Sequence, residues 1–268
     1  MQKLDRLGWT AGITFTSYGL RIGVRVNDPG VLPDITAALP PDWKPAAGGP
    51  VDRLYSFRVA RESRLRSYNL VFAGPVRLAR TFDLREALAH LEGDLQLYVA
   101  ERARRRVFLH AGVVAWKGQA LVFPGMSYAG KSTLTAALVR AGATYYSDEY
   151  AVLDAEGRVH PYARPLLIRD GEGGVRRVPA AELGGDTGAK PLPIGLIALC
   201  RYEEGARWRP RRLPRSQAIL SLLVNTVPAR HQPRRVLPVL HHLARSTDVV
   251  KTRRGEAEEV LRFLLADA

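Results

Sequence analysis

Residues 125–132, GMSYAGKS, match the pattern G-x-x-x-x-G-K-[ST] at every fixed position. In such a loop the glycines let the backbone approach phosphate oxygens closely, and the loop amides form a concave anion site. An apolar stretch at 121–123 precedes the loop, and an apolar helical stripe from Leu134 to Ala141 follows it, ended by Gly142. This strand, loop and helix order predicts a phosphate-binding loop. The predicted nucleotide-binding residues are Gly125, Met126, Ser127, Tyr128, Ala129, Gly130, Lys131, Ser132 and Thr133.

Two side chains at the end of the loop carry the predicted chemistry. Lys131 has the position from which a lysine reaches the β- and γ-phosphates, and the Ser132 hydroxyl has the position of a Mg²⁺ ligand. The start of the following helix adds its positive dipole end to the same site. The predicted cofactors are therefore ATP and Mg²⁺.

A pair of acidic residues, Asp148 and Glu149, follows the loop closely. A helix over 132–141 would run about 15 Å away from the phosphates, and an extended segment over 143–147 would return about 16 Å. The two lengths nearly cancel, so we expect Asp148 to arrive beside Ser132. In a regular strand the two acids would point to opposite faces, unless a bend alters the alternation. A solvated surface pair is the alternative interpretation.

The pattern of apolar residues predicts a mixed α/β chain with two domains. For a small α+β domain over 1–105, we expect strands at 12–16, 20–26, 55–59 and 68–72 and a surface loop at 39–50. Asp83 can cap a helix with apolar residues on one face. That face is formed by Leu84, Leu88, Leu91, Leu95 and Val99.

For the second domain, over 106–268, the sequence predicts an antiparallel hairpin of 107–116 with 119–123, joined by a turn at Lys117 and Gly118. Further strands are expected at 193–202 and 248–251, and helices at 216–227, 237–244 and 256–265. The alternation of helices and strands favours an α/β sheet domain.

Composition favours a globular protein without a membrane span. Of 268 residues, 46% are hydrophobic and 25% are charged, which is typical of a packed domain. No apolar run approaches the ~20 residues needed to cross a bilayer. The first residues carry no apolar stretch, and the single cysteine, Cys200, lies in an apolar run where a buried role is expected. We therefore expect a cytoplasmic location.

The formal net charge of +14 would attract phosphates, acidic peptides and nucleic acid. Arginines cluster at 102–106 and at 207–215, although a coding bias toward arginine would give the same composition. No zinc-finger spacing, ribonucleoprotein motif or basic stretch with interleaved aromatic residues is present in the sequence. The sequence therefore does not favour nucleic acid as a partner.

The chain contains, in this order, His110, the loop at 125–132 and the acidic pair at 148–149. In order and spacing these residues resemble the C-terminal catalytic domain of the HPr serine kinase family, which shares its P-loop fold with phosphoenolpyruvate carboxykinase. The resemblance covers 110–153 well and the rest of the C-terminal half loosely. It implies a P-loop kinase domain behind a small α+β N-terminal domain. Kinases of this family form hexamers, so a homo-oligomer is implied by analogy.

The resemblance also implies roles for individual residues. Asp148 would act as base on an incoming serine hydroxyl, with Lys131 at the phosphates and His110 near the reacting phosphate. Ser132 and Glu149, with Asp148, would bind Mg²⁺, and the residues alone do not decide which acid is base and which binds metal. By itself, a histidine at a strand start would more often be structural.

Two arginines after the acidic pair, Arg164 and Arg169, could stabilise charge in a transition state or could be ordinary surface residues. The family usually has two aspartates where this chain has Asp148 and Glu149, and residues 1–105 do not match its N-terminal domain. The chain therefore resembles the divergent HPr-kinase-related proteins, some of which phosphorylate peptides during maturation.

The expected function is an ATP- and Mg²⁺-dependent phosphotransferase that acts on a hydroxyl, such as a serine of an acidic peptide or a protein. Two alternatives remain from the sequence. One is a kinase of a small-molecule alcohol, and the other is a regulatory protein that binds ATP without transferring phosphate.

Overall fold

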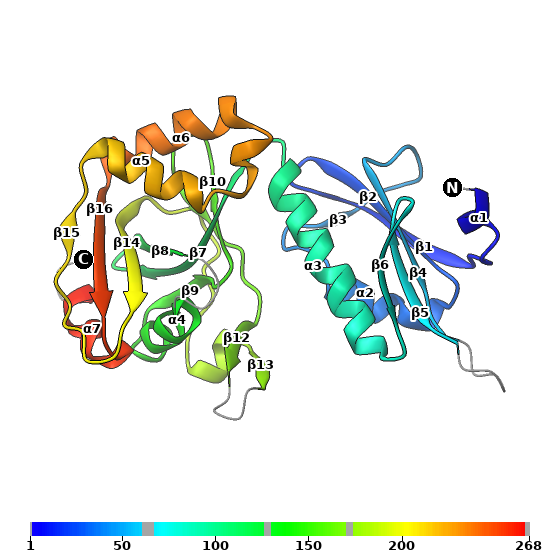
Figure 1. Cartoon of the computed structure of the whole chain (residues 1–268), viewed down its shortest axis with the longest axis horizontal. Helices are drawn as coiled ribbons and strands as arrows, with labels where there is room; N and C mark the ends of the chain where they lie inside the picture. The colour runs from blue at the N-terminus through cyan, green and yellow to red at the C-terminus, as the bar shows by residue number, and fades with distance from the viewer. Residues whose placement is uncertain (1, 61–66, 126–129, 170–173, 266–268) are drawn as a thin grey trace. The chain divides into compact units, whose positions relative to one another are not determined.

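The computed structural model describes residues 2–60, 67–125, 130–169 and 174–265. The chain divides into two compact units, residues 1–105 and residues 106–268 (Figure 1). Each unit combines helices with a sheet that contains both parallel and antiparallel strand pairs. The predicted mixed α/β class is therefore confirmed.

The first unit is built on a six-stranded sheet in the order β3-β1-β2-β4-β5-β6. Its elements are α1 (Gln2–Asp5), β1 (Ala11–Ser17), β2 (Leu20–Val26), η1 (Pro29–Val31), α2 (Leu32–Ala37), β3 (Lys44–Pro45), β4 (Arg53–Arg58), β5 (Asn69–Ala73), β6 (Val76–Thr81) and α3 (Leu84–Arg102). The Asp83 carboxylate accepts a hydrogen bond from the Arg85 amide at 2.8 Å, as the predicted cap requires. Leu91, Leu95 and Val99 of the predicted stripe are fully buried.

The second unit is built on an eight-stranded sheet in the order β11-β10-β7-β8-β14-β16-β15, with β9 also paired to β7. Its strands are β7 (Val107–Trp116), β8 (Gln119–Pro124), β9 (Thr144–Ser147), β10 (Tyr150–Leu153), β11 (Val159–His160), β12 (Leu166–Arg169), β13 (Val175–Val178), β14 (Ile194–Tyr202), β15 (Arg211–Arg212) and β16 (Asp248–Arg254). Its helices are α4 (Lys131–Arg140), η2 (Ala180–Leu183), α5 (Arg215–Val224), η3 (Val227–Arg230), α6 (Pro233–Ser246) and α7 (Ala257–Leu264).

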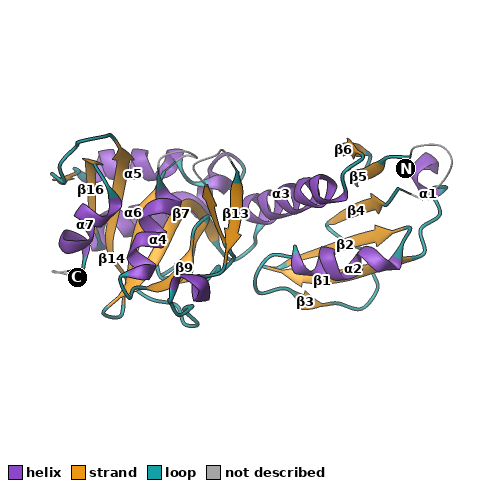
Figure 2. Cartoon of the chain, turned by 90° about the horizontal axis from the view of Figure 1, so that it is seen from below, coloured by secondary structure: helices purple, strands orange, loops and turns teal. Residues whose placement is uncertain are grey.

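Helices cover both faces of this second sheet. Val113 of β7 packs in the core cluster that includes α5 and α6, whereas its neighbour Val114 packs in the cluster that includes α4 and α7. Successive residues of a strand point to opposite faces, so the two clusters lie on opposite sides of the sheet. In Figure 1, α5 and α6 lie above the sheet and α4 and α7 below it, and Figure 2 views the unit from the side of α4 and α7.

Three strands of the second sheet, β8, β14 and β16, run parallel to one another. Their carboxyl ends therefore meet at one edge, which we call the carboxyl edge. The segment at 125–132 follows β8 and so begins at this edge. In open α/β sheets, ligands bind outside the carboxyl ends of the strands.

Several elements differ from the sequence-based expectations. Strands β6, β11, β12, β13 and β15 and helix α2 were not predicted, and the predicted loop at 39–50 contains the two-residue strand β3. Helix α6 begins at Pro233 rather than at residue 237, because a proline is favourable in the first turn of a helix. Strand β16 continues past Lys251 to Arg254, through charged residues that hide the alternation.

None of the helices in the described part of the chain combines the length and the apolar character that a membrane span requires.

Candidate phosphate-binding site

Helix α4 begins where the predicted phosphate-binding loop ends. Gly125 directly follows β8, and Met126, Ser127, Tyr128 and Ala129 lie outside the described residues. Gly130 has a φ of 78°, in the left-handed region that favours glycine, and it precedes the first residue of α4, Lys131. A Cβ atom at Gly130 would also lie 2.5 Å from Nη2 of Arg254. A side chain at this position would therefore be strained and would also displace Arg254.

The first turn of α4 lies directly on strand β7. A Cβ atom at Gly112 of β7 would overlap the Thr135 hydroxyl oxygen and would come within 3.8 Å of the Lys131 Cβ. Glycine at this position allows the helix to approach the strand and brings Lys131 over the sheet edge. The Thr135 hydroxyl oxygen is buried and has no hydrogen-bond partner among the described residues.

The acidic pair occupies a tight bend between two strands. The Ser147 hydroxyl oxygen accepts hydrogen bonds from the amides of Glu149, at 3.2 Å, and Tyr150, at 3.0 Å. These bonds interrupt the regular alternation between β9, which ends at Ser147, and β10, which begins at Tyr150. The bend that the sequence left open is therefore present, and Asp148 and Glu149 need not face opposite sides of the sheet.

Burial and mutual charge shift the ionisation of this group of residues. Burial raises the pKa of Asp148 to about 6, while hydrogen bonding from the Ser132 side chain and the Lys131 charge oppose that rise in pKa. The pKa of Glu149 is raised by burial and by the neighbouring Asp148 charge. Burial lowers the pKa of Lys131, and the charges of Asp148 and Glu149 act against that change in pKa. The hydrogen bond between the Ser132 and Asp148 side chains places Asp148 beside Ser132, the position expected from the lengths of the helix and the returning segment.

One carboxylate oxygen of Asp148, the Oδ1 atom, is buried and has no hydrogen-bond partner among the residues that the structure describes. A buried carboxylate oxygen without a donor is unfavourable unless a proton donor or a cation fills the position. Within the described residues, no group of three or more His, Cys, Asp or Glu side chains could hold a metal by itself. Mg²⁺ binds through one or two carboxylates together with phosphate and water oxygens, and Asp148, Glu149 and Ser132 offer oxygen donors of this kind.

His110 lies on β7, opposite Tyr150 in the ladder with β10. Its carbonyl accepts a hydrogen bond from the Gly125 amide at 3.2 Å, and its own amide donates to the Asn225 carbonyl at 2.8 Å. Burial, and then the Lys131 charge, lower the pKa of His110 to about 4. The imidazole is therefore neutral near pH 7, and the His110 backbone holds the start of the loop.

Arg254, the last residue of β16, is a residue of this site that was not predicted from the sequence. Its side chain is buried, with 2% of the residue exposed, and Nη2 donates to the Gly130 carbonyl at 2.6 Å. Nη1 donates to the Gly255 carbonyl at 2.9 Å, and the guanidinium lies 5.5 Å from the centre of the Tyr202 ring. Alternation along β16 does not single out Arg254 in the sequence, because Val249 and Val250 are both apolar and pack on opposite faces of the sheet.

Arg164 and Arg169, which follow the acidic pair in the sequence, differ in their exposure to solvent. Arg169 is exposed at the end of β12, whereas Arg164 is partly buried and its pKa is lowered to about 10 by burial and then by the Arg177 charge. Arg177 of β13, which the sequence did not single out, lies near enough to Glu149 to oppose the rise in its pKa. Thr133 is exposed on α4.

Neither a scan of protein-family models nor a search of curated proteins finds a match to this chain.

Proposed function

We propose that the second unit is a P-loop kinase domain of the HPr kinase and phosphoenolpyruvate carboxykinase type, which transfers the γ-phosphate of ATP to a hydroxyl group. The observation that carries the proposal is the convergence of Lys131, Ser132 and Asp148 at the carboxyl edge, where the Asp148 Oδ1 atom has no partner in the described structure. Phosphoryl transfer asks mainly for positioning and charge stabilisation, and these groups supply both.

The nucleotide phosphates would bind at the start of α4. Lys131, the first amides of the helix and its positive dipole end would neutralise phosphate charge. Arg254 would act as a positioning residue, because it bonds the carbonyl of Gly130 and so supports the last turn of the loop. Ser132 and Glu149 would hold Mg²⁺, which would neutralise the charge that develops between the β- and γ-phosphates.

Asp148 would accept the proton of the attacking hydroxyl. In the transfer step, the hydroxyl oxygen bonds to the γ-phosphorus and its proton passes to Asp148. The bond from the γ-phosphorus to the bridging oxygen breaks, and ADP leaves with that oxygen. With a pKa of about 6, Asp148 is largely ionised near pH 7 yet basic enough to take part in proton transfer.

The acceptor is proposed to be a serine of a peptide or protein. The order and spacing of His110, the loop at 125–132 and the acidic pair at 148–149 resemble those of the HPr-kinase-related proteins. The net charge of +14 suits an acidic peptide. A small-molecule alcohol would need the same groups at the phosphates, and a panel that contains both kinds of acceptor distinguishes the two.

The deciding experiment follows γ-labelled phosphate from ATP with Mg²⁺ into a panel of serine-containing peptides and small alcohols. Asp148→Asn should lower transfer by about 10²- to 10⁴-fold with ATP still bound, because the base is lost while the volume is kept. Lys131→Ala should weaken ATP binding itself. Asp186→Asn and Lys190→Ala, which change exposed residues elsewhere in the second unit, serve as matched controls. ATP binding that depends on Lys131, with no transfer to any acceptor, would instead indicate a nucleotide-binding regulatory protein.

A further inference from the structure

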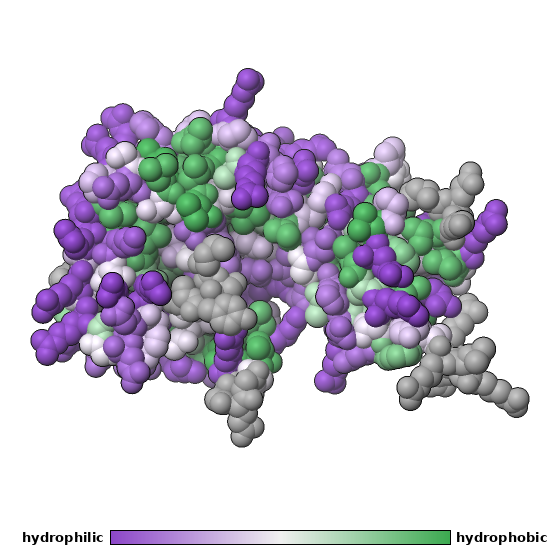
Figure 3. Space-filling model, viewed as in Figure 1, coloured by the Kyte–Doolittle hydropathy of each residue, from purple (hydrophilic) through white to green (hydrophobic). Residues whose placement is uncertain are grey.

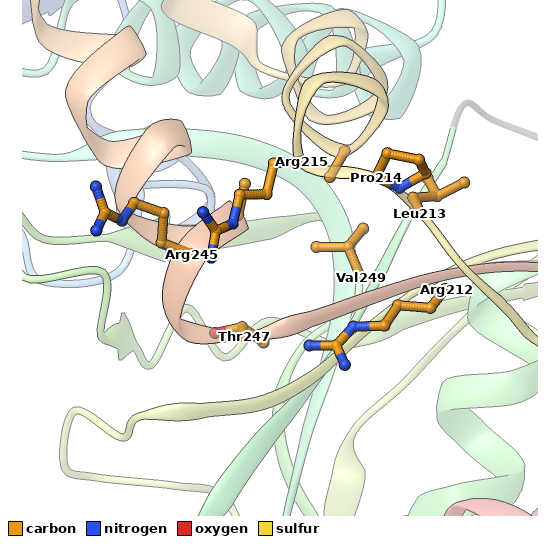
Figure 4. A pocket seen from close by; sticks show the side chains of 9 residues that line it. Arg212, Leu213, Pro214, Arg215, Arg245, Thr247 and Val249 are labelled. Atoms are coloured by element: carbon orange, nitrogen blue, oxygen red, sulfur yellow. The ribbon is translucent and has the colours of Figure 1, made fainter.

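A second polar site lies at the edge of the sheet opposite the carboxyl edge. It is a pocket of about 400 Å³ between the start of α5, the end of α6 and strands β15 and β16 (Figure 4). Thr247 and Val249 form part of its lining, at the beginning of β16, whereas Arg254 stands at the end of the same strand. At about 3.3 Å per residue, the strand separates the two sites by about 20 Å.

Three arginines, Arg212, Arg215 and Arg245, line this pocket, and we call it the arginine pocket. Arg212 forms an ion pair with Asp248. Within the described residues, neither Arg215 nor Arg245 has an ion-pair or hydrogen-bond partner for its guanidinium, and in Figure 4 both extend toward the same end of the pocket. Like charges gathered in a hollow repel one another, so the pocket favours an anion.

The start of helix α5 adds to this preference. Arg215 is the first residue of a helix of 10 residues, and the preceding Pro214 provides no side-chain cap. No acidic residue stands in the first turn to offset the positive end of the helix dipole. The guanidinium fork pairs well with the two oxygens of a carboxylate, so carboxylates suit the arginine pocket.

Exposed apolar residues lie on α5 and α6 beyond the pocket. Leu220 and Val224 of α5 are 63% and 76% exposed, and Leu237 of α6 is 45% exposed. Figure 3 shows hydrophobic residues gathered on the side of the second unit where Figure 1 places these two helices. Contiguous exposed apolar residues rimmed by polar ones are typical of an interaction surface.

We propose that the arginine pocket and the exposed faces of α5 and α6 together bind an acidic peptide segment. Its carboxylates enter the pocket, and its apolar side chains cover Leu220 and Val224. Along the helix axis these residues lie about 7.5 Å and about 13.5 Å from Arg215, and at about 100° per residue they point about 140° and about 180° away from it around the helix. The peptide therefore crosses α5, whose surface has a radius of about 5 Å, and an extended chain follows that path with about four to six residues. The ligand is therefore an acidic cluster followed at that spacing by apolar residues.

This inference goes beyond the proposed phosphoryl transfer and does not depend on it, because peptide binding at the pocket requires no nucleotide. The probe is a fluorescein-labelled synthetic peptide in which glutamates precede leucines at the stated spacing. Binding to the full chain is measured by fluorescence anisotropy. The double variant R215Q/R245Q should weaken binding about tenfold, since two charge-assisted contacts are lost.

The matched control is R140Q/R262Q, which removes the same charge from exposed positions on α4 and α7, across the sheet. It should change the affinity by less than about twofold, as expected for remote screened charges. A second variant, L220S/V224S, tests the apolar part and should also weaken binding. Thermal unfolding of each variant checks that the fold is retained.

The proposal is overturned if the wild-type chain does not bind the peptide, or if both arginine double variants weaken binding equally. Displacement of the peptide by ATP would overturn it as well, since that result would locate the binding at the carboxyl edge. Inorganic phosphate at matched ionic strength separates a small-anion site from a peptide site. If phosphate displaces the peptide as effectively as unlabelled peptide does, the ligand is a small anion and the proposal is wrong.

Discussion

The two opposite edges of the second unit's sheet hold arginines in contrasting settings. At the carboxyl edge, Arg254 is 2% exposed and donates to the Gly130 carbonyl. At the other edge, the Arg212 side chain is 75% exposed and pairs with Asp248 across the surface. A buried charge keeps one geometry and is weakly screened, whereas an exposed charge is solvated and screened by salt. The buried edge therefore suits a small ligand that must be held in one position, and the exposed edge suits an extended, charged one.

The charged residues at the two edges also differ in how much of their hydration they lose on folding. Burial lowers the pKa of Arg254 and of Lys131 and raises that of Asp148, so each of these groups loses part of the stabilisation that water gives its charge. Residues whose pKa values are shifted by burial and by a specific charge partner are typical of functional sites. The arginines of the opposite edge, Arg212, Arg215 and Arg245, are exposed, so water stabilises their charges.

The largest effect on stability is expected from adding a side chain between β7 and α4, near the carboxyl edge. Gly112→Ala should lower the free energy of unfolding by about 1–3 kcal/mol, because the added methyl group overlaps the Thr135 hydroxyl under α4. Urea unfolding followed by circular dichroism measures the change. Adding Thr135→Ala should restore much of the loss, since the overlapping atom is removed. An unchanged stability in the single variant would mean that α4 does not press on β7 as tightly as described.

A smaller effect is expected at Arg254, where a substitution should lower the affinity for ATP but hardly change the free energy of unfolding. Arg254→Met should weaken ATP binding about tenfold, because the Gly130 carbonyl loses its guanidinium donor. The free energy of unfolding should change by less than about 1 kcal/mol, because removing a buried charge offsets the lost hydrogen bonds. Isothermal titration calorimetry and urea unfolding measure the two quantities.

Two further variants sharpen this comparison of the edges. Arg254→Lys should not restore the affinity for ATP, because an ammonium cannot reproduce the fork that bonds both carbonyls. Arg212→Met, at the exposed edge, should leave both ATP affinity and stability nearly unchanged. Equal losses of ATP affinity at the two edges would remove the distinction between a positioning arginine and a surface one.

The smallest effect is a pH dependence. The transfer rate should rise with pH through the Asp148 pKa of about 6, and this rise should be absent in Asp148→Asn. Stability should change in the opposite direction. The folded pKa lies above the unfolded value of 3.8, so the stabilisation is complete below 3.8 and is lost as pH rises through about 6. Activity and urea unfolding measured across this window test both signs, and a rate independent of pH would argue against Asp148 as the base.

Much of the fold followed from local sequence signals. The hairpin of β7 and β8 turns at Lys117 and Gly118, as predicted, and α3 begins after its Asp83 cap. Strands β11, β12, β13 and β15 were missed because they are only two to four residues long and carry little periodicity. Pairing partners far away in the sequence stabilise such short strands, and a local pattern does not contain that information.

For the candidate site, the sequence by itself determined the groups whose positions follow from local backbone geometry. The pattern that ends at Gly130, Lys131 and Ser132 requires a tight turn before a helix, and the segment lengths bring Asp148 back to that helix. These are consequences of backbone geometry over a short stretch of chain, so they can be read from the residues alone.

Only the tertiary structure decided which distant charges join the site and which remain at the surface. Arg254 reaches Gly130 because β16 lies parallel to β14, which in turn lies parallel to β8. The arginine pocket exists because the end of α6 packs beside the start of α5. Both arrangements depend on burying apolar faces of elements that are far apart in sequence, and burial is a property of the whole packed core rather than of any one segment.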